Sequence, residues 1–171
     1  MIIRSSGAAD TESIVALFTA SVHQIAARSY SPEQLAAWAP ESRDLEQWRA
    51  RLVGLETLHA EFDGELAGFI SFSCAGHIAL LFTSPAFSRR GVASRLYESA
   101  VRKCLAKGVT KLTTEASIEA RPFFESKGFK VVEQQAVERN GVQLKRFAMT
   151  GFCAGKAGRP DRFAVSCSSC G

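Results

Sequence analysis

The segment Ser88–Ser94, with the sequence Ser-Arg-Arg-Gly-Val-Ala-Ser, has the residue types of an anion-binding loop. It follows a very apolar run, His77–Thr83, and leads into a stretch with helical periodicity. The first backbone N–H groups of a helix have no intrahelical partner, and the helix dipole adds partial positive charge there. Gly91 has no Cβ atom, so the backbone can approach a phosphate closely. This context predicts a phosphate or pyrophosphate site, although Arg-Arg-Gly also occurs in ordinary surface loops.

The composition of the 171-residue chain is that of a globular domain with a mild positive charge. Hydrophobic residues make up 46% and charged residues 22%, which favours one domain with a hydrophobic core. The net charge of +4 suits a small polyanionic ligand, and the absence of a basic run predicts no nucleic-acid partner. No apolar run has the length of a membrane helix, and the chain starts directly in a strand-like pattern. We therefore expect a cytoplasmic protein with no membrane partner.

The five cysteines are too scattered to indicate a disulfide framework. Cys167 and Cys170 form a single C-x-x-C pair without a second pair of ligands, so we expect no metal site. From Ala154 the chain becomes rich in glycine and serine. The sequence therefore predicts a domain over residues 1–150 and a flexible tail over residues 151–171.

Helical periodicity dominates the first third of the chain after a short strand at Ile2–Arg4. Asp10 is a plausible N-cap for a helix over Ser13–Ala27. A second helix starts at Ser31 with a proline in its first turn. A third helical piece is expected over Leu45–Val53.

The pattern then changes to strands, with two more helices between them. Asp-Gly and Asn-Gly dipeptides predict two hairpins, and Gly108 is expected to end the long helix. The expected strands are Thr57–Phe62, Leu66–Cys74, His77–Thr83, Val109–Thr114, Phe129–Val137 and Val142–Met149, and the helices are 91–107 and Glu119–Lys127. This order predicts an α/β (α+β) domain around one mixed sheet.

The order of elements, with an arginine-glycine loop after the fourth strand, resembles the GNAT superfamily of acetyl-CoA-dependent N-acetyltransferases. The phosphate loop of that superfamily reads Gln/Arg-x-x-Gly-x-Gly/Ala, which Ser88–Ala93 matches except at its first position. Arg121–Phe129 is similar to the short helix that ends in Gly-Phe in the superfamily. Tyr30–Leu35 and Thr114–Ser117 are similar to a bacterial subgroup of uncertain substrate. The resemblance covers about residues 1–150 and implies about seven strands, flanked by helices and splayed between the fourth and fifth strands.

The resemblance also implies where acetyl-CoA, as co-substrate, would bind. A bulge near Phe82 and Thr83 would free backbone groups to pair with the pantetheine arm. The pyrophosphate would be surrounded by loop residues, mainly through their backbone N–H groups: Arg89, Arg90, Gly91, Val92, Ala93 and Ser94. The guanidinium groups of the two arginines either contact phosphate or face solvent. Three more residues would lie further along the carrier: Ser117, Phe124 and Lys127. Ser117 occupies a position where many relatives have asparagine, and Lys127 could equally be a surface residue.

Acyl transfer to an amine requires removal of a proton, because an alkyl amine is mostly protonated at neutral pH. His77 stands where some relatives have a glutamate base, and a histidine titrates in the required range. The alternative is a strand-end residue half in solvent. Glu115 could hold the amine or relay a proton through water, or it could cap the next helix. Trp38 could line the acceptor pocket or belong to the hydrophobic core. His23 could line the same pocket or lie on the surface.

The departing thiolate benefits from a proton donor, which in many relatives is a tyrosine on the short helix. The matching residue here is Phe124, which has no proton to give. Tyr30 is a candidate donor, while Tyr97 is expected to be structural. The expected activity is transfer of an acetyl group to the amine of a small molecule or peptide, by a monomer or homodimer. The missing tyrosine keeps a non-catalytic acyl-CoA sensor or recruitment module as the alternative.

Overall fold

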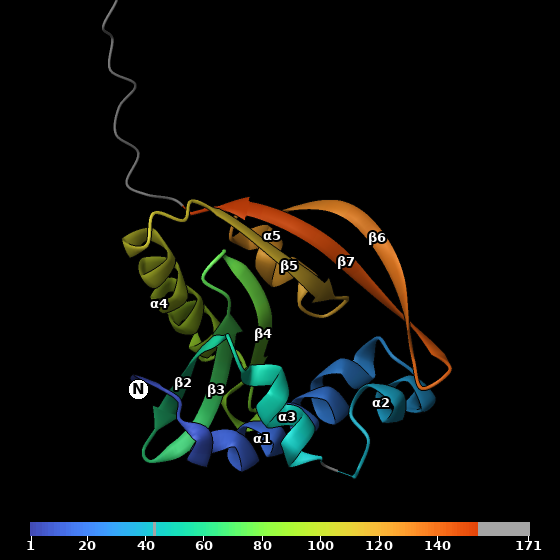
Figure 1. Ribbon diagram of the computed structural model, residues 1–171. Helices are drawn as coiled ribbons and strands as arrows, with labels where there is room; N and C mark the ends of the chain where they lie inside the picture. The colour runs from blue at the N-terminus through green and yellow to red at the C-terminus, as the bar shows by residue number, and fades with distance from the viewer. Residues whose placement is uncertain (43, 154–171) are drawn as a thin grey trace, which may run out of the picture.

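A seven-stranded mixed sheet in the order β1-β2-β3-β4-β5-β7-β6 organises the computed structural model, which describes residues 1–42 and 44–153 (Figure 1). Neighbouring strands are antiparallel except for the parallel pair β4 and β5. The strands are β1 (Ile2–Ser5), β2 (Glu56–Phe62), β3 (Glu65–Phe72), β4 (His77–Thr83), β5 (Lys111–Ser117), β6 (Lys130–Arg139) and β7 (Val142–Phe152). The helices are α1 (Thr11–Ile25), α2 (Pro32–Trp38), α3 (Leu45–Leu52), α4 (Val92–Ala106) and α5 (Arg121–Ser126), with 3-10 turns η1 (Ala8–Asp10), η2 (Ala26–Arg28) and η3 (Pro85–Phe87).

The predicted fold class and the number of strands are confirmed, with shifts in several element bounds. β5 starts and ends later than predicted, and α1 ends at Ile25 before a 3-10 turn. β7 reaches Phe152, and the Cys153 amide donates to the Thr110 carbonyl at 2.7 Å. Residues 151 and 152 are therefore part of β7, and Cys153 is bonded to the chain just before β5, all within the range expected to be a tail. The rest of that tail, with its C-x-x-C pair, lies outside the described residues.

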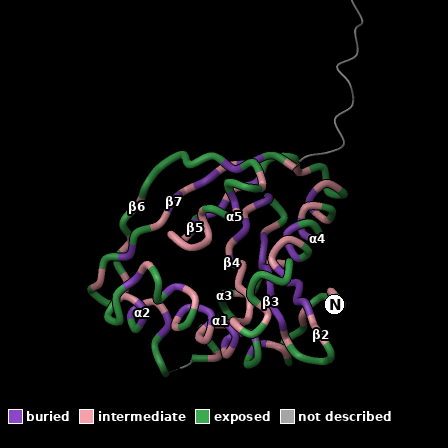
Figure 2. Tube along the Cα trace, turned by 180° about the vertical axis from the view of Figure 1, so that it is seen from behind, coloured by how far each residue is buried: buried purple, intermediate pink, exposed green. Residues whose placement is uncertain are grey.

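Two hydrophobic layers cover the two faces of the sheet. On one face, α4 packs Leu96 and Ala100 against Leu58 and Ile70 of the sheet. On the other face, α1 contributes the side chains Ile14, Leu17, Phe18 and Val22, which pack with Phe69 and Leu80. Figure 2 shows the buried residues along the central strands and the inward sides of these helices. No helix within the described ranges has the length and hydropathy needed to cross a membrane.

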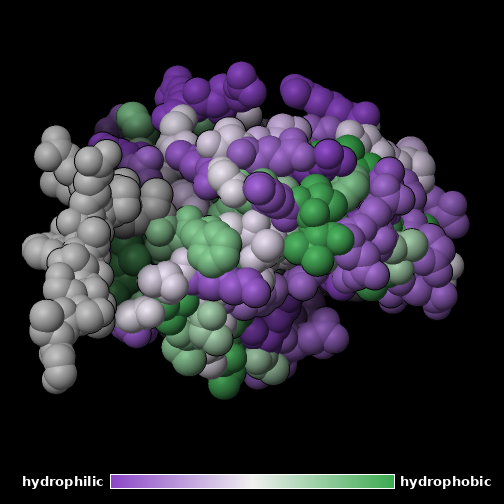
Figure 3. Space-filling view, turned by 90° about the horizontal axis from the view of Figure 1, so that it is seen from above, coloured by the Kyte–Doolittle hydropathy of each residue, from purple (hydrophilic) through white to green (hydrophobic). Residues whose placement is uncertain are grey.

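β6 is an edge strand whose residues are mostly exposed. Val132 has 68% of its surface exposed, but the strand also carries Lys130, Glu133 and Glu138. Figure 3 looks onto the side where β6 and β7 lie in Figure 1, and shows small hydrophobic patches among mostly hydrophilic residues. Charged side chains of this kind hinder pairing of an edge strand with another chain.

β4 contains a bulge that changes which face its residues reach. Ser71 of β3 pairs with Leu80, whereas the next residue, Phe72, pairs with Ile78, so Ala79 is the extra residue. Ile78 consequently packs on the α4 side and Leu80 on the α1 side, although they are two positions apart. The prediction of a bulge near Phe82 and Thr83 is wrong, because both residues pair regularly with β3.

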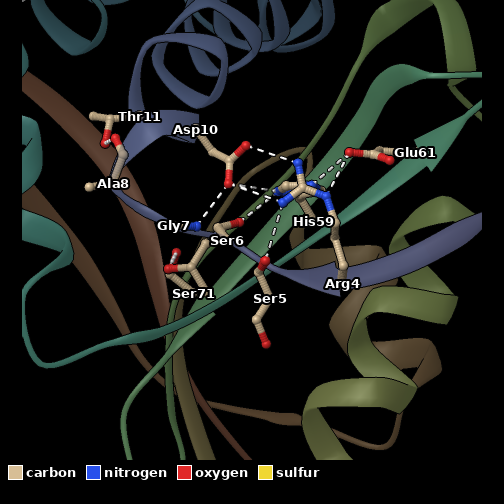
Figure 4. Close-up of polar contacts among 11 residues, drawn as sticks. Arg4, Ser5, Ser6, Gly7, Ala8, Asp10, Thr11, His59, Glu61 and Ser71 are labelled. Atoms are coloured by element: carbon tan, nitrogen blue, oxygen red, sulfur yellow. Dashed lines mark hydrogen bonds and ion pairs between the residues drawn. The ribbon is translucent and has the colours of Figure 1, made fainter.

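A polar cluster fixes β1 against β2 (Figure 4). His59 is 1% exposed, and its Nδ1 and Nε2 lie 2.7 Å from Ser6 Oγ and 3.0 Å from Glu61 Oε1. Arg4 contacts the carboxylates of both Glu61 and Asp10, and its guanidinium lowers the pKa of each. Asp10 is the N-cap residue of α1, as predicted, but its side chain makes no capping bond, because its carboxylate accepts the Gly7 amide at 2.8 Å in the preceding 3-10 turn.

Candidate active site

β4 and β5 separate after only two paired positions, His77 with Thr113 and Ile78 with Thr114. The buried Thr114 hydroxyl donates to the Ile78 carbonyl at 2.9 Å, at the point where the pairing ends. Beyond it, β4 stays paired with β3 alone and β5 with β7 alone, and the two strands diverge (Figure 1). The predicted splay is confirmed. The backbone of residues 79–83 therefore has no strand on its β5 side.

Two cavities meet at this splay. The His77 cavity, of about 260 Å³, is lined by His77, Glu115 and Tyr30 among others. The Gly91 cavity, of about 390 Å³, is lined by the loop before α4 and its first turn. Both cavities share five lining residues: Trp38, Leu81, Phe82, Ser117 and Ala120. A ligand in one cavity can therefore meet a ligand in the other between the two strands.

The loop before α4 has the backbone of an anion cradle. Gly91 is the N-cap of α4 with a φ of 78°, and Arg89 also has a positive φ of 64°. The Ser88 and Arg90 amides bond back into the turn, whereas those of Arg89 and Gly91 have no hydrogen-bond partner among the described residues. The first turn of α4 adds further free N–H groups. These donors and the helix dipole favour a phosphate at this position.

Close packing beneath the loop holds the start of α4 in place. A Cβ atom on Gly68 of β3 would lie 2.9 Å from Val92 Cγ1 and 2.9 Å from the Phe82 carbonyl oxygen. Only glycine therefore lets α4 approach β3 this closely. The Val92 side chain is buried in this contact, so Val92 offers the cavity mainly its backbone.

Most of the residues predicted to bind the cofactor line the two cavities. Thr83, Arg89, Gly91, Val92, Ala93 and Ser94 line the Gly91 cavity, Phe82 and Ser117 line both, and Phe124 lines the His77 cavity. Two predicted residues point elsewhere. The Arg90 guanidinium lies over the Phe87 ring at 5.6 Å, and Lys127 Nζ lies 3.7 Å from Glu98 and 5.7 Å from the Tyr97 ring.

His77 and Glu115 form a pair on one face of the splayed sheet. His77 Nε2 lies 3.2 Å from Glu115 Oε2, and His77 Nδ1 lies 3.0 Å from Thr113 Oγ1. The imidazole is thus fixed between a hydroxyl and a carboxylate. Both side chains remain about one-third exposed, so a substrate or a water molecule can reach them. Such a pair can accept and release one proton as a unit.

Tyr30 is a buried wall of the His77 cavity. Its hydroxyl donates to the Lys145 carbonyl at 2.6 Å and accepts from the Ile118 amide at 3.0 Å. It therefore ties the segment before α2 to β7 and to the chain just after β5. Burial raises the pKa of this phenol. Tyr97 is buried against α5, as predicted for a structural residue, and burial raises its pKa to about 12.

The other two residues considered for the acceptor pocket differ in their placement. Trp38 lines both cavities and packs edge-on against Tyr30 and Phe82. His23 Nε2 lies 2.7 Å from the Ala39 carbonyl oxygen, and His23 lines neither of these cavities. Trp38 therefore contributes to the site, and His23 lies outside it.

Basic residues from distant elements also line the His77 cavity, and no local sequence pattern pointed to them. They are Arg51 of α3, Arg139 of β6, and Lys145 and Arg146 of β7. Burial lowers the pKa of Arg51 and of Arg139, and the charge of Arg146 lowers that of Arg139 further. The alternation of inward and outward residues along β6 and β7 was the one available clue. Arg139 follows the inward Val137 by two positions, and Arg146 follows the buried Leu144 by two positions, so both arginines lie on the inward face of their strands.

Comparisons with known proteins agree with this architecture. A family model described as an acetyltransferase (GNAT) domain matches residues 26–150. The chain is 38% identical over 147 residues to the uncharacterized N-acetyltransferase YafP of Escherichia coli (strain K12), covering 86% of this chain and 93% of YafP. The crystal structure of a GCN5-related N-acetyltransferase from Rhodopseudomonas palustris has a TM-score of 0.84 and 33% identity, covering 88% of this chain and 94% of that one. PaiA N-acetyltransferase from Thermoplasma acidophilum, solved with coenzyme A, shares the fold with a TM-score of 0.69 and 20% identity, covering 88% and 98%.

Proposed function

Because the chain belongs to the GNAT acetyltransferase family, we propose that it transfers an acetyl group from acetyl-CoA to the amine of a small molecule or peptide. The observation that carries this proposal is the pair of cavities that meet between β4 and β5. One cavity offers free backbone donors for a diphosphate, and the other holds an exposed histidine–carboxylate pair. A carrier thioester and an amine would thus enter from opposite sides and meet at the splay.

In this proposal the amides of Arg89 and Gly91 and the first turn of α4 hold the diphosphate of the carrier. The unpaired edge of β4 over residues 79–83 pairs with the amides of the pantetheine arm as an added strand would. Ser117 borders the same path, although its hydroxyl already accepts the Ala120 amide at 3.1 Å. The PaiA structure, which has the same fold and contains coenzyme A, supports coenzyme A as the carrier.

The acetyl group would lie near Leu81 and Phe82, which border both cavities. An unpaired N–H group of β4 would stabilise the negative charge that develops on the carbonyl oxygen. The amine nitrogen bonds to the carbonyl carbon as the carbon–sulfur bond breaks, which leaves an amide and the CoA thiolate. The aromatic side chains Phe18, Trp38 and Phe82 pack together above this point and limit the access of water.

The His77–Glu115 pair would take the proton of the amine, directly or through one water molecule, and for this step His77 Nδ1 would exchange its contact with the Thr113 hydroxyl for the amine or the water. The carboxylate orients the imidazole through Nε2, and the Thr113 hydroxyl lies 3.0 Å from the opposite ring nitrogen. Tyr30 would have to break its bond to the Lys145 carbonyl before it could donate a proton. We therefore give Tyr30 a positioning role and assign proton transfer to His77 and Glu115.

Phe124 favours a second candidate function, because it is buried beside the site and has no proton for the leaving thiolate. A non-catalytic acyl-CoA-binding module would need no such donor. The enzyme remains the better account, since a thiol with a pKa near 8.5 is a good leaving group without assistance. The exposed His77–Glu115 pair also has no evident purpose in a protein that only binds the carrier.

Release of free CoA thiol from acetyl-CoA, measured with a panel of amines, tests the proposed function. We expect thiol release that depends on both the amine and the protein, together with thermal stabilisation by CoA. Stabilisation by CoA without turnover of any amine would favour the binding module. Neither stabilisation nor turnover would overturn the placement of the carrier.

A further inference from the structure

Three arginines that line the His77 cavity lack an acidic partner. Arg51, Arg139 and Arg146 take part in none of the ion pairs found among the described residues. The polar partner of Arg146 is the neutral amide of Gln135, at 2.9 Å from Nε. Arg51 lies over the Trp48 ring at 4.9 Å. The cavity therefore carries positive charge that no acidic side chain of the described residues compensates through an ion pair.

The rest of the cavity lining does not balance this charge. Glu115 is the one carboxylate that lines it in the described part of the chain, and it already contacts His77. Lys145 also lines this cavity, but its amine lies over the Phe147 ring at 5.3 Å. Burial lowers the pKa values of Arg51 and Arg139, and the charges of Arg139 and of Arg146, respectively, lower them further. Arg139 and Arg146 are half-buried, whereas Arg51 is exposed at the edge of the cavity. A half-buried charge without a partner is destabilising, so these neighbouring cations are favourable mainly when an anion binds there.

The arginines and the His77–Glu115 pair reach the cavity from different positions on the sheet and from α3. Arg146 of β7 is paired with Ser117 of β5. Ser117 follows Glu115 by two residues and lies on the same face of β5. Arg139 is close to the turn of the β6–β7 hairpin, where it pairs with Val142. Arg51 comes from α3 and borders the same space. A ligand between these groups would meet a proton acceptor at one end and cations at the other.

We propose that the acceptor is a small amine that also carries a carboxylate, phosphate or phosphonate group, held by Arg51, Arg139 and Arg146. This inference rests on the proposed acetyltransferase function. The planar guanidinium binds such oxyanions through paired hydrogen bonds, which orients the bound molecule as well as attracting it. A cavity of about 260 Å³ suits a small molecule. The anion would fix the amine so that its nitrogen faces the acetyl group.

Pairs of amines, one member with an anionic group and one without, test the proposal. We would compare kcat/KM for glycine with glycinamide, for β-alanine with β-alaninamide, and for 2-aminoethylphosphonate with ethanolamine. The anionic member of at least one pair should be preferred by about tenfold or more, which corresponds to ~1.4 kcal/mol. Arg139→Gln and Arg146→Gln should each reduce that preference by about tenfold, mainly through KM. Equal use of anionic and neutral amines by the wild-type protein would overturn the inference while leaving the acetyltransferase function intact.

Arg102→Gln is the matched control. Arg102 is an exposed arginine on α4 that contacts Ser99 and lines neither cavity. Its substitution should leave the preference for anionic amines unchanged. Arg139→Gln should not lower the melting temperature, because it removes a charge that is half-buried beside Arg146, and this separates recognition from folding. An Arg102→Gln effect equal to that of Arg139→Gln would mean that general surface charge, and not the cluster, sets the preference.

Binding of unreactive products separates failure of this inference from failure of the proposed function. N-acetylglycine and N-acetylglycinamide would be titrated into the CoA-loaded protein and its Arg139→Gln and Arg146→Gln variants. Tighter binding of N-acetylglycine, lost in both variants, supports the anion site even if no amine in the panel is acetylated. Equal affinity for the two probes contradicts it. Absence of CoA binding in the same experiment would instead contradict the acetyltransferase function.

Discussion

The Nε2 atom of His77 lies 3.2 Å from the Oε2 atom of Glu115, across the only paired segment of β4 and β5 in the described structure. The parallel pairing of His77 with Thr113 places Glu115 two residues further along the same face of β5. Beyond this pair the strands separate and the two cavities open. The proposed proton acceptor is therefore built into the point at which the sheet splits.

His77→Gln should lower kcat by about 100-fold, because general acid–base catalysis by a positioned side chain contributes on this order. CoA affinity should be unchanged, since His77 does not line the Gly91 cavity. Steady-state kinetics between about pH 6 and 9 and CoA titration check the two parts. His23→Gln, a histidine outside both cavities, should leave kcat near the wild-type value. A His77→Gln profile identical to wild type would remove His77 from the mechanism.

Glu115→Gln should lower kcat by on the order of tenfold, because the amide keeps the shape but does not stabilise a protonated imidazole. If the pair acts as a unit, the double variant with His77→Gln should be no slower than His77→Gln alone. The four proteins form a double-mutant cycle measured under one set of conditions. Losses that simply multiply would show that the two residues act independently.

Tyr30→Phe should lower the free energy of unfolding by about 1–3 kcal/mol, since it leaves the Lys145 carbonyl and the Ile118 amide without their partner. Chemical denaturation measures this change. If Tyr30 only positions the segments that it joins, Tyr30→Phe should not alter the pH dependence of kcat. Loss of a basic limb from the kcat profile would instead make Tyr30 the proton donor to the thiolate.

The Arg4 cluster should make stability depend on pH in the acid range. Arg4 lowers the pKa values of Asp10 and Glu61 in the folded state. Their contribution is therefore fully present above the ordinary carboxyl pKa of about 4 and is lost as the pH falls through the lowered values. The difference in unfolding free energy between wild type and Arg4→Gln should shrink below about pH 4. A difference that is constant from neutral to acid pH would contradict this account.

Local patterns were sufficient to predict the loop and the helix that follows it. Gly91 stands between an apolar strand and an amphipathic helix, and the structure places it as the N-cap of α4 with a left-handed backbone. The Asp-Gly and Asn-Gly turns likewise predicted both hairpins, because the positive φ values that these turns need are local properties. The family resemblance supplied the splay and the candidate residues.

Features that depend on pairing between distant segments were not predictable in the same way. The bulge lies at Ala79 because the register of β3 with β4 requires an extra residue there, and no residue type in β4 signals it. Arg51, Arg139 and Arg146 stand on three separate elements, so their shared cavity exists only in the folded chain. Asp10 looked like a helix cap, but a tertiary contact with Arg4 and the 3-10 turn take up its carboxylate.

Calorimetric titration of CoA into the wild type and two glycine variants tests the central claim, that the Gly91 loop holds the carrier diphosphate. Gly91→Glu places a carboxylate at the phosphate site, whereas Gly108→Glu makes the same change at the far end of α4, where the φ is also positive and space is also open. We predict that Gly91→Glu weakens CoA binding by about 100-fold or more, and that Gly108→Glu binds as the wild type does. Equal CoA affinity in all three proteins would contradict the account.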